Sequence, residues 1–189
     1  MIVMNDDRPA TIESTRAFEG RVFTVRIDRV RYSDGAEHRV DVVEHGPSVA
    51  IVATPSHRQL VLVRQYRQAA GTALWELPAG AANPGEDALE GAARELREET
   101  GFRAARLQCI GSLFATPGFC DEEMHFVHAS ELSEGATEFD EDERIETGVF
   151  TLERAWRLVA EGAVRDMKTV LALYWMEGVR GELRSEFGR

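Results

Sequence analysis

The sequence predicts an α/β sandwich with a mixed sheet, preceded by a small antiparallel β module. Three observations predict it: apolar and polar residues alternate across residues 17–44, an acidic amphipathic helix is expected near the middle of the chain, and two helical patterns, Glu153–Glu161 and Asp166–Glu177, follow near its end. Strands interrupted by a central helix and closed by terminal helices are typical of layered α/β domains.

The N-terminal part is expected to form its own β module. Residues 1–15 are polar, and we expect them to be poorly ordered. The alternation that follows predicts a β-hairpin or a three-strand meander. So small a sheet is marginal alone, so it should pack on the main domain or on a second subunit. The boundary is expected at His45-Gly46-Pro47, which gives a module at 1–46 and a domain at 47–189.

Composition restricts the class of protein. The 189 residues carry a net charge of −11, which disfavours a nucleic-acid partner but not a small phosphate compound. No apolar run reaches the roughly 18–20 residues of a membrane helix, and no signal peptide is evident, so no membrane partner and a cytoplasmic location are expected. Cys109 and Cys120 have no metal-ligand spacing, and we expect reduced thiols.

The main domain should contain five strands. Alternating or continuous apolar runs place them at Ser48–Thr54, Leu60–Tyr66, Ala105–Phe114, Met124–Ala129 and Thr147–Leu152.

A pair of arginines and an acidic segment in this domain can each be interpreted in two ways. Arg64 and Arg67 are either solvated or recognise phosphate or carboxylate as planar forks. Glu131–Glu146 predicts a mobile acidic loop that is either only solvated or brings a carboxylate over a substrate.

The central helix should begin after Pro84-Gly85 and end at Gly101. Glu86 and Asp87 place negative charge in its first turn, and glycine suits the left-handed C-terminal position. Its apolar stripe is expected to consist of Leu89, Ala92, Ala93 and Leu96.

Three carboxylates share another side of this helix. Glu95, Glu98 and Glu99 fall within an arc of about 100°, and Gly91 leaves room in the same arc. Like charges so close together favour a bound cation, and hard oxygen ligands suit Mg²⁺ or Mn²⁺. The alternative is a solvated helix with ion pairs such as Arg94 to Glu98.

The stretch 80–102 resembles the Nudix box, in which glycine, glutamate and an Arg-Glu-aliphatic-x-Glu-Glu-x-Gly core stand at fixed spacing. The matching positions are Gly80, Glu86, Arg94, Glu95, Leu96, Glu98, Glu99, Gly101 and Phe102. The resemblance implies the Nudix α/β/α sandwich. We expect Arg94 to orient the glutamates through ion pairs rather than to contact substrate. Glu86 is expected to be structural at the helix start, with a role in the outer shell of the metal site as the alternative.

Features outside the box resemble the ADP-ribose pyrophosphatase subfamily. They are the N-terminal strand module with Phe18–Phe23, the run Val63–Arg67 followed by Glu76–Gly80, and Pro117, sixteen residues beyond Gly101. The likeness implies metal-dependent hydrolysis of ADP-ribose to AMP and ribose 5-phosphate.

The resemblance also implies roles for individual residues. The metal ligands would be Glu95, Glu98, Glu99 and the backbone carbonyl of Ala79, with Glu98 and Glu99 catalytic as well. Substrate would be bound by Arg67, Gly118 and Glu122, and by Arg21 from the second subunit of a homodimer built through the N-terminal strands.

The acidic loop should supply the remaining groups. We expect Glu141 as the general base and Glu143 as a further metal ligand, while Glu138 is an alternative for either role. Other readings are a Nudix pyrophosphatase for a nucleotide sugar, a dinucleoside polyphosphate or an oxidised nucleotide, and a non-catalytic ADP-ribose sensor.

Overall fold

The computed structural model describes residues 8–135 and 145–179, which form two compact units. The first contains the described residues up to Pro47 together with Leu113–Glu123, and the second contains Ser48–Ser112 and the described residues from Met124 onward. The first unit thus includes a segment beyond the module expected at 1–46. Backbone hydrogen bonds fix that segment, because Val43 N–H donates to Phe119 O (2.7 Å) and Asp121 N–H to Val43 O (3.1 Å).

The first unit is built on an antiparallel meander. Its strands are β1 (Ala10–Glu19), β2 (Thr24–Arg31) and β3 (Glu37–Glu44), in the order β1-β2-β3. The predicted meander is therefore confirmed. The expectation that residues up to 15 are poorly ordered is wrong from Ala10 onward, because threonines with good strand propensity pair with β2, for example Thr11 opposite Val30 and Thr15 opposite Ile27.

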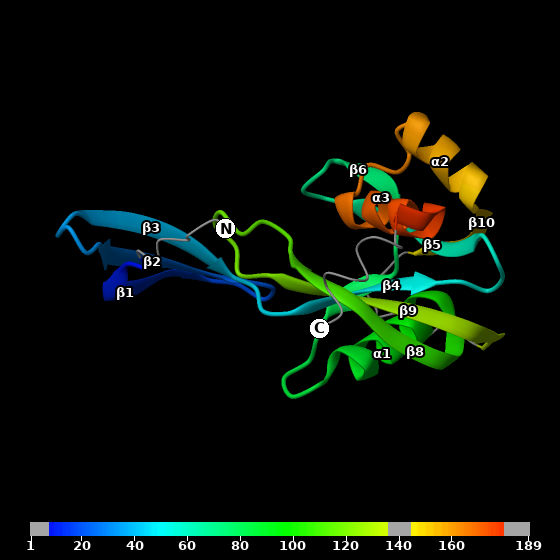
Figure 1. Cartoon of the computed structure of the whole chain (residues 1–189), viewed down its shortest axis with the longest axis horizontal. Helices are drawn as coiled ribbons and strands as arrows, with labels where there is room; N and C mark the ends of the chain where they lie inside the picture. The colour runs from blue at the N-terminus through cyan, green and yellow to red at the C-terminus, as the bar shows by residue number, and fades with distance from the viewer. Residues whose placement is uncertain (1–7, 136–144, 180–189) are drawn as a thin grey trace. The chain divides into compact units, whose positions relative to one another are not determined.

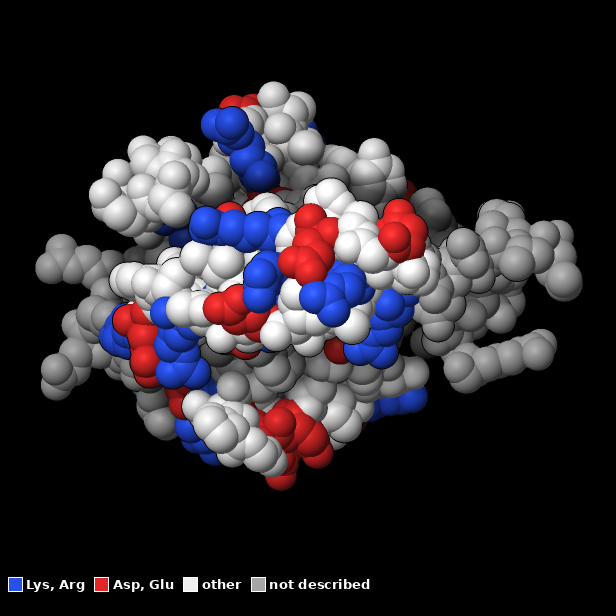
Figure 2. Space-filling model, turned by 90° about the vertical axis from the view of Figure 1, so that its left-hand side faces the viewer, with Lys and Arg blue, Asp and Glu red and all other residues white. Residues whose placement is uncertain are grey.

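Side chains of both charge signs cover this sheet. Figure 2 shows basic (blue) and acidic (red) side chains intermingled on the side of the molecule that faces the viewer. On this sheet Arg29 lies 3.0 Å from Glu13 and Arg31 lies 2.6 Å from Glu37. Such exposed pairs contribute little to stability, about 0–1 kcal/mol each.

The second unit contains two sheets, with strand orders β10-β5-β6 and β7-β4-β9-β8. Their strands are β4 (Ser48–Ala53), β5 (Gln59–Arg67), β6 (Thr72–Glu76), β7 (Ala79–Ala81), β8 (Phe102–Phe114), β9 (Glu123–Glu134) and β10 (Glu146–Thr151). β4 pairs parallel with β9 and antiparallel with β7, so this sheet is mixed, as predicted.

Helices cover both sides of these sheets. α1 (Ala88–Thr100) lies on one side in Figure 1, and α2 (Leu152–Ala160) and α3 (Met167–Tyr174), continued by a π-helical turn at Trp175–Val179, lie on the other. The predicted α/β sandwich is confirmed. No helix within the described ranges is long and apolar enough to span a membrane.

The layering follows from strand β4, which is buried on both faces. Val49 and Ile51 belong to the core cluster under α1 with Ala92 and Leu96, whereas Ala50 packs in the cluster under α2 and α3. Alternate side chains of a strand point to opposite faces, so one continuous apolar run supplies both cores.

Three expectations about the helices and strands differ from the structure. β9 continues to Glu134, so the predicted acidic loop begins later than Glu131. β6 and β7 were not expected, because they are short and flank Pro78. In α1, Leu89 and Ala93 are exposed while Ala92 and Leu96 are buried, so the predicted stripe is too wide.

Candidate active site

The ends of α1 set the position of the acidic helix. Asp87 caps its N-terminus by accepting from the N–H groups of Leu89 (2.8 Å) and Glu90 (2.9 Å), and the Glu90 carboxylate accepts from the N–H of Asp87 (3.1 Å). This capping box satisfies N–H groups that have no partner within the helix. At the other end Gly101 has φ 75°, the left-handed conformation expected from the sequence.

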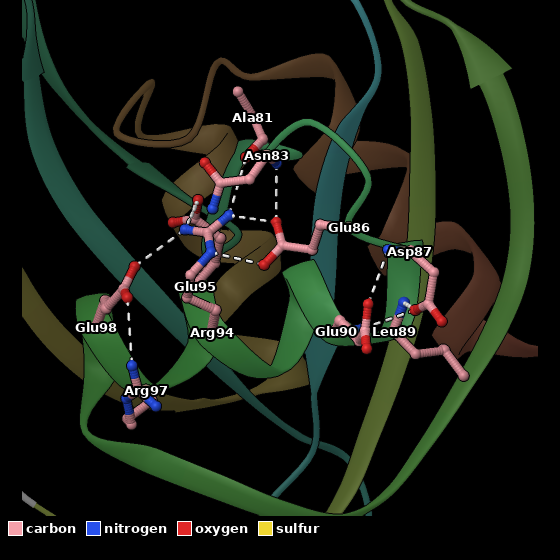
Figure 3. A network of polar contacts seen from close by, with 10 residues as sticks. All are labelled: Ala81, Asn83, Glu86, Asp87, Leu89, Glu90, Arg94, Glu95, Arg97 and Glu98. Atoms are coloured by element: carbon pink, nitrogen blue, oxygen red, sulfur yellow. Dashed lines mark hydrogen bonds and ion pairs between the residues drawn. The ribbon is translucent and has the colours of Figure 1, made fainter.

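Arg94 lies at the centre of the polar network that Figure 3 shows. Its Nη1 donates to Glu95 Oε1 (2.7 Å) and to Glu98 Oε2 (3.0 Å), and its Nε donates to Glu86 Oε1 (2.9 Å). Its Nη2 donates to Glu86 Oε2 (2.9 Å) and to the carbonyl of Ala81 (3.0 Å). The expected ion pairs between Arg94 and the glutamates are thus present. One guanidinium fixes three carboxylates and the loop before the helix.

The network changes the titration of its members. The hydrogen bonds from Arg94 and from the backbone N–H of Asn83 lower the pKa of Glu86 from 4.5 to about 2. The hydrogen bond to Glu86, outweighing burial, raises the pKa of Arg94 above its ordinary value. Glu86 therefore stays ionised at neutral pH and acts as the structural residue expected at the helix start.

Gly80 on β7 makes room for the carboxylate of Glu95. A Cβ at position 80 would lie 2.1 Å from Glu95 Oε1 and 2.2 Å from Cδ, well inside the shortest contacts that real Cβ atoms make. Any larger residue would therefore displace Glu95. This explains in physical terms why glycine begins the box.

Glu99 is held separately from the other two glutamates. It is buried (3% exposed), and its Oε2 accepts a hydrogen bond from the N–H of Ala79 at 3.0 Å. The hydroxyl of Thr147 on β10 donates to the backbone carbonyl of Glu99 (3.0 Å). The structure thus brings together Ala79 and Glu99, which the sequence assigned to the same metal site.

The donor set suits a hard divalent cation. Glu95, Glu98 and Glu99 supply carboxylate oxygens, the ligands that Mg²⁺ and Mn²⁺ prefer, and Gly80 preserves the space beside Glu95. In the part of the chain that the structure describes, no three His, Cys, Asp or Glu side chains converge as a metal-binding group. Glu95 and Glu98 face Arg94, whose single positive charge offsets only part of their negative charge. The residues fit the expected ion, and the assignment of individual ligands stays a prediction.

The role expected for Gly91 is wrong. Gly91 is buried, and a Cβ there would lie 3.3 Å from Glu86 Oε2 and 3.5 Å from Val49 Cγ1. It therefore allows α1 to approach β4 and Glu86, and does not open a path for a metal ion.

Arg67, expected to bind substrate, lies in a cluster that sequence reasoning did not identify. Its Nε and Nη2 donate to Oε1 (2.9 Å) and Oε2 (3.1 Å) of Glu76, and Lys168 Nζ donates to the same Oε2 (2.7 Å). Burial raises the pKa of Glu76, but the hydrogen bonds from Arg67 and the charge of Lys168 outweigh it, so the pKa lies below its ordinary value. The signal that could have indicated this cluster is that Lys168 is the one lysine in the sequence.

The other predicted site residues lie in the first unit or outside the described residues. Arg21, Gly118 and Glu122 are in the first unit, Arg21 in the turn after β1 and the other two in the segment 115–122. Their roles toward substrate stay predictions. The loop glutamates Glu138, Glu141 and Glu143 lie outside the described residues.

Comparisons with known proteins agree with this architecture. The family description "NUDIX domain" matches residues 44–174. A protein of Bacillus methanolicus named methanol dehydrogenase activator is 35% identical, and ADP-ribose pyrophosphatase of Bacillus subtilis (strain 168) is 36% identical. Each alignment covers 88% of this chain and 91% of the relative. A crystal structure of an ADP compounds hydrolase superposes with a TM-score of 0.79 at 26% identity, covering 94% of this chain and 95% of the other. Matched over most of its length and carrying the complete box from Gly80 on β7, through α1, to Phe102 on β8, this chain belongs to the Nudix family.

Proposed function

We propose that this Nudix enzyme hydrolyses the diphosphate bond of ADP-ribose, giving AMP and ribose 5-phosphate. The observation that carries the proposal is the arrangement on α1, where Arg94 fixes Glu95 and Glu98 and the Ala79 N–H fixes Glu99. The similarity to an ADP-ribose pyrophosphatase and to an ADP compounds hydrolase supports the choice of substrate.

The family works with a divalent metal ion, and we propose Mg²⁺, with Mn²⁺ as a substitute. Glu95, Glu98, Glu99 and the Ala79 carbonyl would hold it, with Glu143 as a further ligand. When bound, such an ion neutralises charge on the phosphoryl oxygens and lowers the pKa of water.

The chain's own residues would orient the reactants. Because Arg94 bonds both Glu95 and Glu98, it restricts their rotamers, and pre-ordered carboxylates lose less entropy when the substrate complex forms. Glu141 is our candidate for the base that accepts the proton of the attacking water. Arg67 would contact the diphosphate, and Gly118, Glu122 and the partner subunit's Arg21 would complete the pocket.

We also propose the cytoplasmic location and the homodimer that the sequence led us to expect. The homodimer is supported by the exposure of Phe18 (53%), Val22 (59%) and Phe23 (42%) at the β1–β2 end of the first unit. Grouped exposed apolar side chains often mark a protein contact surface. Light scattering on the purified protein should give twice the 21.1 kDa chain mass, and a monomer would contradict the dimer.

The activity is tested with purified protein, ADP-ribose and Mg²⁺, with both products quantified against an EDTA control. Metal-dependent release of AMP and ribose 5-phosphate in equal amounts is expected, with kcat/KM of ~10⁴ M⁻¹s⁻¹ or more. If ADP-ribose is stable while a nucleotide sugar, a dinucleoside polyphosphate or an oxidised nucleotide is cleaved, the substrate is wrong. Binding of ADP-ribose without cleavage of any of these would indicate a sensor.

A further inference from the structure

Lys168 is exceptional in this chain. The sequence contains 21 arginines and one lysine, and that lysine stands in the first turn of α3 with its side chain only 11% exposed. Lysine is a compact point charge, whereas arginine is a planar fork suited to bidentate pairing. A lysine that is largely buried contributes little to solubility, so we looked for a role in the groups that surround it.

Two carboxylates hold the Lys168 ammonium. Nζ lies 2.7 Å from Glu76 Oε2 and 3.1 Å from Asp166 Oδ1. The other oxygen of Asp166 caps α3 by accepting from the N–H of Thr169 (3.0 Å). Asp166 thus satisfies the helix N-terminus and also directs Lys168 toward Glu76.

Glu76 is shared by two cations. Its carboxylate is 5% exposed and accepts from Arg67 at both oxygens, while Lys168 takes the second lone pair of Oε2. A carboxylate has enough acceptor sites for all three bonds. The consequence concerns Arg67: if one of its N–H groups turns to another anion, Glu76 is still paired. Without Lys168 the same movement would leave the buried Glu76 carboxylate without a cation at that oxygen, and the full cost of its desolvation would then count against the fold.

The cluster adjoins the acidic helix through the short segment after Glu76. The N–H of Leu77 donates to Thr169 Oγ1 (2.8 Å), and the N–H of Ala79 donates to Glu99 (3.0 Å). Burial lowers the pKa of Arg67, but the hydrogen bond to Glu76 and the charges of Glu76, Glu99 and Asp166 outweigh it, so the pKa lies above its ordinary value. The first turn of α3 is therefore connected to the box through the backbone segment from Leu77 to Ala79.

We propose that Lys168 is a positioning residue for diphosphate recognition, which neutralises Glu76 so that Arg67 can donate to the substrate. The inference rests on the proposed function, because it requires Arg67 to meet an anionic phosphate group. Lys168 itself does not contact the substrate.

Steady-state kinetics of Lys168→Met test the inference, with Lys168→Arg as the charge-retaining variant. Arg154→Met is the matched control, since Arg154 pairs with Glu161 (2.7 Å) on exposed α2 of the same unit. Lys168→Met should raise KM at least fivefold with kcat within twofold of wild type. Lys168→Arg should recover most of the difference, and Arg154→Met should change neither constant. An unchanged KM in Lys168→Met, or equal losses of kcat and kcat/KM that Lys168→Arg does not rescue, would overturn it.

The wild-type protein alone distinguishes failure of the proposed function from failure of the role proposed for Lys168. If it does not cleave ADP-ribose, the substrate proposal fails, and the same three variants are compared on whichever diphosphate it cleaves.

A second measurement needs no variant. Selective ¹⁵N-lysine labelling gives one side-chain ammonium signal, because the chain has one lysine. Addition of ADP-ribose in EDTA, which prevents turnover, should shift this signal as Arg67 moves from Glu76 toward the phosphates. A signal that stays in place while the ligand binds would refute the coupling.

Discussion

Substitution of Gly80 by alanine should remove activity while leaving the fold intact. The new Cβ would lie 2.1 Å from Glu95 Oε1, whereas real Cβ atoms essentially never come within 3.0 Å of a neighbour. The backbone of Gly80 is not in the left-handed region, so alanine itself causes no backbone strain. The contact falls on the end of a flexible side chain. Glu95 should therefore move by about 1 Å, while β7 and the core under α1 stay in place.

A displacement of this size is large for the metal ligand that we propose Glu95 to be. Mg²⁺ requires oxygen ligands at about 2.0–2.1 Å in near-octahedral geometry, and misplacing a catalytic group by ~1 Å can cost ~100-fold in rate. We expect kcat/KM for Gly80→Ala to fall ~100-fold, equivalent to ~2.7 kcal/mol of transition-state stabilisation, and the half-saturating Mg²⁺ concentration to rise. The thermal midpoint should change by no more than a few degrees.

A double-mutant cycle with Glu95→Ala isolates the cause. If Gly80→Ala acts through Glu95, it should cost less than about threefold when Glu95 is already alanine, because coupled residues are not additive. The assay is product release over a Mg²⁺ titration, with circular dichroism as the control for folding. Independent, multiplicative losses in the double variant, or near-normal activity of Gly80→Ala, would refute the reasoning.

Three further outcomes are expected. Glu99→Gln should lower kcat at least tenfold, ~1.4 kcal/mol, in assays at saturating Mg²⁺, and near-normal turnover would exclude Glu99 as a ligand. Arg94→Lys should lower the free energy of unfolding by about 1–3 kcal/mol in urea titrations, because one ammonium cannot replace the fork between Glu86 and the other glutamates; an unchanged value would contradict the network. Ionised Glu86 stabilises the fold fully above its unfolded pKa of 4.5, and this contribution is lost as the pH falls toward its folded pKa of about 2. The stability difference between wild type and Glu86→Gln should therefore narrow across that range, and a constant difference would contradict the pKa.

The box helix could be predicted because its signals are local. Gly101 ends the helix as predicted, whereas Asp87 is the N-terminal cap and Glu86 precedes it, so both lie before the first turn in which they were expected. The two-faced burial of β4 was likewise visible as a continuous apolar run. These elements depend on residues close in sequence, so one sequence suffices.

The features that were missed depend on distant partners. β1 is polar, and its strand conformation comes from pairing with β2 rather than from an apolar pattern. Gly91 was expected to face a ligand, but only the position of β4 shows that it faces Val49. Glu76 and Lys168 are 92 positions apart, so their contact could not be deduced from spacing.

The arrangement on α1 also explains how three glutamates coexist on one helix. Left without a cation, they would repel one another and destabilise α1. Arg94 offsets part of the charge of Glu95 and Glu98, while Glu99 accepts a hydrogen bond from the N–H of Ala79. An ion that binds all three carboxylates competes with Arg94 for two of them but not for the third. The guanidinium that orders the proposed ligands would therefore also compete with the ion for Glu95 and Glu98. Removal of Arg94 should weaken the fold, whereas the loss of order and the loss of competition would change the metal affinity in opposite directions.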